Sequence, residues 1–149
     1  MPIITWSDYF LSIAEAVRQK SKDPNTKVGA VIVGPDHQII STGFNGFPRG
    51  IDETIAARWD VPLKYDFIEH AERNAIYNAA RHGISLKGCS MYLSTFAVPC
   101  IACSKAVIQS GIVTVVGTAR EPTPDHWVDN LKFAELMLRE AGVECRSYT

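Results

Sequence analysis

The sequence lacks long hydrophobic runs and has no excess of either charge. No apolar stretch among its 149 residues approaches the roughly 18–20 residues that a membrane-spanning helix needs, so we expect no membrane span. Its 15 Lys and Arg residues are balanced by 16 Asp and Glu residues, which gives a net charge of −1. Without a basic surplus the chain has little non-specific attraction for nucleic acid, and a nucleic-acid partner is not expected. Internal repeats and low-complexity segments are also missing, so we expect one domain over residues 1–149.

Cysteine is scarce, and there is no recognisable secretion signal. The first ten residues, MPIITWSDYF, contain neither the basic region nor the apolar segment of such a signal. Four cysteines without a signal indicate the reducing cytoplasm, where structural disulfides are rare. In that compartment two cysteines close in sequence more often bind a metal or take part in chemistry. The pair Cys100 and Cys103 is therefore a candidate for either role.

Hydrophobic periodicity predicts alternating helices and strands. Helical spacing is found in TWSDYFLSIAEAVRQKS, EHAERNAIYNAARHG, CIACSKAVIQSG and HWVDNLKFAELMLREAG, and strand patterns in KVGAVIVG, IISTGFN, SMYLST, IVTVVG and VECRSY. The first two strands are close enough to form an antiparallel hairpin. We expect the segment from Gly46 to about Phe67 to be an irregular loop. This order predicts one mixed sheet with helices packed on its faces.

The close cysteine pair follows Pro99 and opens a predicted helix. Three hypotheses fit Cys-x-x-Cys alone: a redox pair, half of a closed structural zinc knuckle, or part of a catalytic metal site. A knuckle needs a fourth ligand, for which Cys89 or His82 would have to serve. Both the knuckle and the redox pair leave the motif His70-Ala71-Glu72 without a role.

His70 is the histidine best suited to complete a metal site. His37 falls in the hairpin turn, where we expect a solvated side chain, and His82 ends a helix, where a cation complements the helix dipole. His126 opens the last helix, where a surface role is favoured. At the first turn of a helix, His70 and Glu72 can both face one centre. His70 would then be the third zinc ligand beside Cys100 and Cys103, and Glu72 would remain as a free carboxylate. A His-x-Glu motif followed by Pro-Cys-x-x-Cys is the signature of zinc-dependent nucleobase deaminases.

With these motifs the sequence resembles the zinc-dependent cytidine/deoxycytidylate deaminase superfamily, and most closely its deoxycytidylate (dCMP) deaminase branch. The resemblance covers nearly the whole chain and is carried by SKDPNTKVGAVIV, STGFNGFPRG, HAERNAI, LKGCSMYLS, PCIACSKAVIQSGI and EAGVECRSY. It implies an α/β fold, a three-layer α-β-α sandwich with a five-stranded mixed sheet. It also implies a homo-oligomer (hexamer or dimer), a cytoplasmic location and an effector response to dCTP or dTTP.

The resemblance also implies an activity, the hydrolytic deamination of dCMP to dUMP and ammonia by a zinc-activated water. His70, Cys100 and Cys103 would bind Zn²⁺, and Glu72 would shuttle protons. The implied substrate contacts are Asn45 to the sugar, the Ala71 N–H to the pyrimidine edge, Val28 and Pro99 around the base, and Lys27, Arg49 and Arg120 as candidates for the phosphate. Two alternatives stay open: deamination of another cytosine-type nucleotide, nucleoside or amino-heterocycle base, and a zinc-stabilised interaction module without catalysis. The near-neutral charge argues against a polynucleotide editor.

Two segments depart from the family pattern. The stretch YLSTFAVPC is about two residues longer than expected between the strand tyrosine and Pro99. The loop 117–127 lacks the tyrosine that the branch carries after its fourth strand, and Trp127 or His126 are candidates to replace it. Both segments are expected to border the substrate pocket, so both bear on substrate choice.

Overall fold

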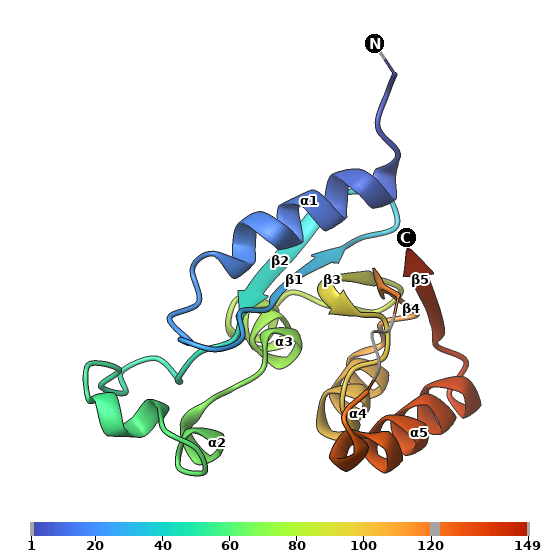
Figure 1. Cartoon of the computed structure of the whole chain (residues 1–149). Helices are drawn as coiled ribbons and strands as arrows, with labels where there is room; N and C mark the ends of the chain where they lie inside the picture. Colours follow the sequence, from blue (N-terminus) through green and yellow to red (C-terminus); the bar gives the residue numbers. More distant parts are fainter. Residues whose placement is uncertain (1, 120–122, 149) are drawn as a thin grey trace.

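The computed structural model describes residues 2–119 and 123–148 (Figure 1). Its elements are α1 (Trp6–Arg18), β1 (Gly29–Val33), β2 (Ile39–Phe44), the 3-10 helix η1 (Ala56–Trp59), α2 (Lys64–Phe67), α3 (Ala71–Arg81), β3 (Ser90–Phe96), α4 (Ile101–Ser110), β4 (Thr114–Thr118), α5 (Asp125–Glu140) and β5 (Glu144–Tyr148). No helix in these ranges is long and apolar enough to cross a membrane.

The five strands form one mixed sheet in the order β2-β1-β3-β4-β5. β1 runs antiparallel to both β2 and β3, whereas β3, β4 and β5 run parallel to one another. The parallel strands are connected through α4 and α5, as a parallel pair requires a crossover. The predicted hairpin and the predicted mixed sheet are therefore confirmed.

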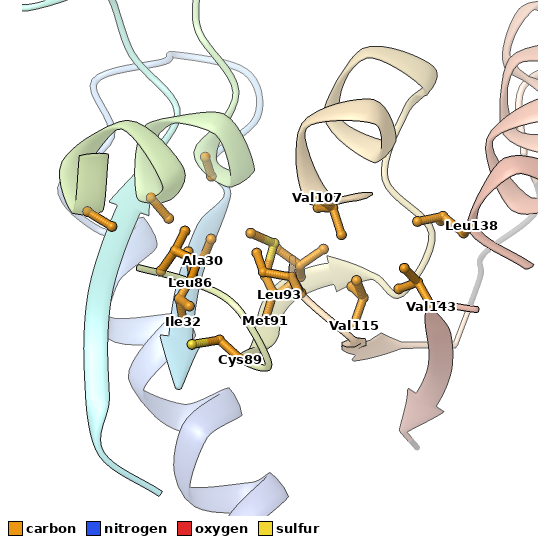
Figure 2. Packing of buried hydrophobic residues seen from close by; sticks show 14 residues of the cluster. Ala30, Ile32, Leu86, Cys89, Met91, Leu93, Val107, Val115, Leu138 and Val143 are labelled. Carbon is orange, nitrogen blue, oxygen red and sulfur yellow. The ribbon is translucent and has the colours of Figure 1, made fainter. Parts of the chain in front are cut away.

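Helices cover both faces of the sheet, which gives the expected three layers. α1 lies on one face, where Phe10 and Ala14 are buried against Val31 and Tyr92. α3, α4 and α5 lie on the other face (Figure 1). Figure 2 shows the larger core on that side, in which side chains of β1, β3 and β4 meet those of α4 and α5.

A glycine sets how closely α3 approaches the sheet. A Cβ atom on Gly43 in β2 would lie 2.3 Å from the Ala75 N atom and 2.5 Å from the Ala71 O atom, both in the backbone of α3. Because only a glycine leaves room for this contact, the first turns of α3 rest directly on β2. This close packing fixes the position of His70 and Glu72, which flank Ala71.

The segment from Gly46 to Phe67 is only partly the irregular loop that the sequence predicts. It contains the short helices η1 and α2, because successive turns close hydrogen bonds such as Ile68 N–H to Lys64 O, at 2.9 Å. The segment projects away from the sheet in Figure 1 and returns to it through the paired backbone of Gly46 and Glu69. His70 follows this pairing, so the loop is anchored where the predicted metal site begins.

Candidate active site

His70, Cys100 and Cys103 come together at the N-terminal ends of α3 and α4. His70 is the N-cap residue of α3 and Cys100 is the N-cap residue of α4, with Cys103 one turn further on. The Nδ1 atom of His70 lies 3.5 Å from the Cys100 sulfur and 3.3 Å from the Cys103 sulfur. Both helices start at the end of the sheet where β1 begins and β2 and β3 end, which brings the two motifs together.

This group fits a zinc ion. Zn–N bonds of about 2.0–2.1 Å and Zn–S bonds of about 2.3 Å in a tetrahedral site place N and S roughly 3.5 Å apart, close to the separations found here. The ligand atoms of the three residues all lie within 4.8 Å of one another. Within the described residues the group has three members and includes neither Cys89 nor His82. Three protein ligands leave a position for water or substrate, which is typical of a catalytic rather than a structural zinc site.

The two sulfurs affect each other's protonation. Hydrogen bonds from the Cys103 thiol, and then from His70, lower the pKa of the Cys100 thiol far below its ordinary value despite burial. The hydrogen bond to Cys100, followed by burial, raises the pKa of the Cys103 thiol. One thiolate is therefore available at neutral pH, and metal binding must displace the proton of the second.

Glu72 lies beside this group as a buried carboxyl that is not one of the three ligands. Its residue exposure is 6 %, and it lines the same cavity as His70 and Cys100. Burial raises the pKa of the Glu72 carboxyl, and the nearby His70 opposes that shift. A buried carboxyl with a raised pKa next to a metal site suits a group that both accepts and donates protons.

A second ring of contacts holds the ligands. Glu69 accepts a hydrogen bond from the backbone N–H of His70 through Oε1, and the same oxygen pairs with the Arg73 guanidinium. Burial opposes the charge of Arg73, but the hydrogen bond to Glu69 and the nearby charges of Cys103, Glu69 and Cys100 together outweigh it and raise the pKa of Arg73. On α4, the buried Ser104 hydroxyl donates to Pro99 O at 3.0 Å, which fixes the turn before Cys100.

The ligands open into a cavity of about 340 Å³. Its lining residues come from the segment before β1, the 46–69 loop, the starts of α3 and α4, the end of β3 and the start of α5. They are Asp23, Thr26, Val28, Asn45, Lys64, Tyr65, Ile68, His70, Ala71, Glu72, Thr95, Phe96, Val98, Pro99, Cys100, Thr123, Pro124, Trp127 and Leu131. A cavity of this size, with apolar walls and polar groups that converge on a reactive centre, is typical of a small-molecule site.

The predicted substrate contacts divide into two groups. Four of them, Asn45, Val28, Ala71 and Pro99, line the cavity, and so does Trp127, whereas His126 does not. Lys27 and Arg49 are exposed and outside the lining, and the Arg49 guanidinium donates to Oδ1 of Asn78. Arg120 lies outside the described residues.

Asn45 is held by a network of hydrogen bonds. Its Oδ1 accepts the Val28 N–H at 2.8 Å, and its Nδ2 donates to Thr26 O at 2.8 Å and to Asp23 Oδ2 at 3.4 Å. Both amide hydrogens are therefore used within the protein. A carbonyl oxygen has two acceptor positions, so Oδ1 retains one for a ligand hydroxyl.

Sequence reasoning missed a buried ion pair in the cavity wall. Lys64 Nζ lies 3.0 Å from Asp23 Oδ2, and the two side chains are 9 % and 2 % exposed. The Asp-Pro-Asn stretch that holds Asp23 is a typical turn signal, and its carboxylate does accept the Asn25 and Thr26 N–H groups. Nothing local indicates Lys64, because the two partners are 41 residues apart.

Strand β3 carries a bulge in the stretch YLSTFAVPC, ahead of Pro99. Tyr92 pairs with Val116 and Phe96 pairs with Thr118, so residues 93–95 lie opposite the single residue Gly117 and β3 has two residues in excess. Within the bulge, Ser94 Oγ accepts the Gly29 N–H at 2.8 Å, and Thr95 and Phe96 line the cavity. The bulge thus shapes one wall of the site.

The fold and the three-ligand site with its free carboxyl define a zinc-dependent hydrolase of the deaminase class. The model of the "Cytidine and deoxycytidylate deaminase zinc-binding region" matches residues 4–119, and the chain belongs to this family. Its cofactor is Zn²⁺.

Individual relatives agree with this assignment. The chain is 37 % identical over 150 residues to the deoxycytidylate deaminase of Homo sapiens, covering 97 % of this chain and 80 % of the human protein. It is 39 % identical over 145 residues to an "Uncharacterized deaminase in luxG 3'region" of Aliivibrio fischeri, covering 95 % of this chain and 92 % of that protein. The crystal structure of dCMP deaminase from the cyanophage S-TIM5 with dCMP and dUMP matches with a TM-score of 0.74 and 26 % identity, over 95 % of each chain.

Proposed function

We propose that this chain hydrolyses dCMP to dUMP and ammonia. The observation that carries the proposal is the buried Glu72 in the same cavity as the group His70, Cys100 and Cys103. The names of the relatives support the choice of substrate, since the human protein is a deoxycytidylate deaminase and the cyanophage enzyme was solved with dCMP and dUMP.

The proposed roles follow from the chemistry of each group. His70, Cys100 and Cys103 would hold Zn²⁺, which when bound would supply a water of lowered pKa as the nucleophile. Glu72 accepts the proton that this water loses and donates a proton to N3 of the pyrimidine as C4 is attacked. Glu72 would then take the proton of the new C4 hydroxyl and pass it to the amino group, so that the C4–N4 bond breaks, ammonia leaves and the C4 carbonyl forms. Because one carboxylate acts first as base and then as acid, no second catalytic carboxyl is required.

The substrate is proposed to lie between the 46–69 loop and the β3 bulge. The free acceptor position of Asn45 Oδ1 suits a sugar hydroxyl. The Ala71 N–H, at the uncapped start of α3, suits the pyrimidine edge, while Val28 and Pro99 supply apolar contacts to the base. Lys27 and Arg49 stay predictions for phosphate contact, although neither lines the cavity; among the described lining residues the lysine is Lys64.

Further features of the proposed enzyme rest on the resemblance. We expect a single deaminase domain over residues 1–149, a cytoplasmic location and a homo-oligomer, either hexamer or dimer. A response to dCTP or dTTP as effector also stays a prediction. Analytical ultracentrifugation with and without these nucleotides tests the oligomer and the effector response together.

Steady-state kinetics tests the proposed substrate. The panel is dCMP, dCTP, deoxycytidine, cytosine and guanine, assayed with the zinc-loaded protein. We expect dCMP to have the highest kcat/KM. Negligible turnover of dCMP with good turnover of another member would replace the proposal by the alternative, a deaminase for another cytosine-type or amino-heterocycle substrate, which the β3 bulge favours.

The non-catalytic alternative, a zinc-stabilised interaction module, is tested by Glu72→Ala. We expect this variant to lose deaminase activity while its zinc content and its folding are retained. A module would instead show no activity in the unaltered protein on any member of the panel.

A further inference from the structure

A helix remote in sequence holds the start of α4, the helix that carries two of the proposed zinc ligands. The backbone N–H of Ile101 donates to Oδ1 of Asn130 at 3.0 Å, across 29 residues of chain. Asn130 is half-buried in α5, and α4 and α5 pack against each other. The bonded N–H belongs to the residue that directly follows Cys100.

The start of α4 cannot be capped in the usual way. A helix N-terminus has N–H groups without intrahelical acceptors, which a Ser, Thr, Asp or Asn side chain at the N-cap normally satisfies. The N-cap residue of α4 is Cys100, and its side chain makes no cap hydrogen bond. The Cys100 sulfur instead faces His70 Nδ1, at 3.5 Å. For the first N–H of the helix, that of Ile101, an acceptor is supplied by α5.

Asn130 also sits where α5 meets the cavity. Trp127, one turn earlier in α5, and Leu131, the next residue, both line the cavity around the ligands. Asparagine is a weaker helix former than Ala, Leu or Lys, so helix propensity does not explain its place inside α5. Its amide oxygen is explained by the hydrogen bond to the α4 backbone.

We propose that Asn130 is a positioning residue that holds the Cys100–Cys103 turn in its zinc-binding conformation before the metal arrives. The inference rests on the proposed ligand set and is independent of which substrate is deaminated. Partners that orient metal ligands typically contribute about 10–100-fold to metal affinity or activity. We therefore expect loss of the Asn130 acceptor to speed zinc release by about tenfold.

The test is the rate at which zinc passes from the full-length protein to a coloured chelator. Asn130→Leu keeps the volume and removes the acceptor, so it should release zinc about tenfold faster. Asn130→Asp keeps an acceptor oxygen at the same place and should restore slow release. Asn78→Leu is the matched control. The Asn78 side chain also bonds the backbone of a neighbouring element, since its Nδ2 donates to Thr42 O at 2.7 Å, but Asn78 lies two helical turns after His70 in α3. It should lower the melting temperature without changing zinc release.

Release from Asn130→Leu at the unaltered rate would overturn the proposal, whatever the kinetics with dCMP show. Should Asn130→Leu not fold, amide hydrogen exchange of the unaltered protein decides. We expect the Ile101 amide to be protected both with zinc and after its removal, because its acceptor comes from Asn130. Rapid exchange of that amide in the zinc-free protein would mean that the metal orders the turn, and would contradict the proposal.

Discussion

The Nδ1 atom of His70 lies 3.3 Å from the sulfur of Cys103, although the two residues are 33 positions apart in the chain. We expect zinc to stabilise the fold through this group, because binding to the folded state alone adds RT ln(1 + [L]/Kd), about 4 kcal/mol at 1,000 times Kd. In thermal unfolding, added zinc should raise the melting temperature of the unaltered protein. Cys103→Ser should abolish most of the increase, while Cys145→Ser, at a half-buried thiol outside the group, should retain it. An equal increase in all three proteins would contradict the ligand assignment.

Glu72→Gln should separate activity from stability. General acid–base catalysis contributes about 10²–10⁴-fold to the rate. We therefore expect kcat to fall by about 10²-fold or more, while KM changes little. Burial raises the pKa of Glu72, which means that its ionised form is disfavoured in the folded state at neutral pH. A neutral amide of the same shape removes that cost, so the zinc-free variant should be at least as stable to urea as the unaltered protein. A large loss of stability would indicate a structural role for the carboxylate.

The buried pair of Asp23 and Lys64 should make stability depend on acid. Burial would raise the pKa of Asp23, but hydrogen bonds from the Asn25 N–H, from Lys64 and from the Thr26 N–H outweigh it and lower that pKa. A folded-state pKa below the unfolded value stabilises the protein above the unfolded pKa of about 3.9, and this contribution is lost as the pH falls through the folded value. Urea unfolding between pH 7 and pH 3 should show this loss.

Removing one partner of the same pair should cost more than removing both. Lys64→Met leaves the Asp23 carboxylate buried without its cation, and breaking a buried pair in this way typically costs about 3–5 kcal/mol at neutral pH. The double variant Asp23→Asn with Lys64→Met should recover part of that loss and should lose the part of the acid dependence that Asp23 contributes. A single variant as stable as the unaltered protein would show that the pair contributes nothing.

The sequence predicted the five strands, the four longer helices and the candidate ligands because these rest on local patterns, whereas η1 and α2 were not predicted. Periodicity identified the strands on either side of the site, and the His70 and Cys100 motifs each lie within one helical turn. The Asp23–Lys64 pair and the Ile101–Asn130 hydrogen bond could not be predicted, because they join segments whose contact depends on how the loop and α5 pack. The phosphate contact of Lys27, just before β1, and of Arg49, in the loop after β2, stays a prediction, because a local pattern does not tell which way an exposed side chain faces.

The expected extra length at YLSTFAVPC stays a prediction, and the sequence did not predict the bulge that β3 has in this stretch. A longer turn ahead of Pro99 and a bulge within the strand give the same residue count. The bulge depends on Gly117 in the neighbouring strand, where the close approach of another backbone requires a residue without a side chain. That requirement is visible only once β3 and β4 are paired.

Gly117→Ala tests whether the bulge shapes the substrate site. A Cβ atom there would lie 2.4 Å from Thr95 O and 2.6 Å from Ala97 N, both backbone atoms that cannot rotate away. We expect a loss of about 1–3 kcal/mol in the free energy of unfolding, as for other overpacked sites. Because Thr95 and Phe96 line the cavity, displacement of the bulge should also change KM for dCMP by more than it changes kcat.

Gly34→Ala is the matched control for that variant. The three atoms nearest to its added Cβ all belong to the exposed side chain of Gln38, which can move at the cost of one surface hydrogen bond to the Asp36 N–H. We expect a loss of stability of at most about 1 kcal/mol and an unchanged KM. Urea unfolding and initial-rate kinetics on both variants supply the two measurements. If Gly117→Ala loses stability but keeps the KM of the unaltered protein, the bulge serves packing alone, and substrate choice depends on the opposite wall around Asn45 and Lys64.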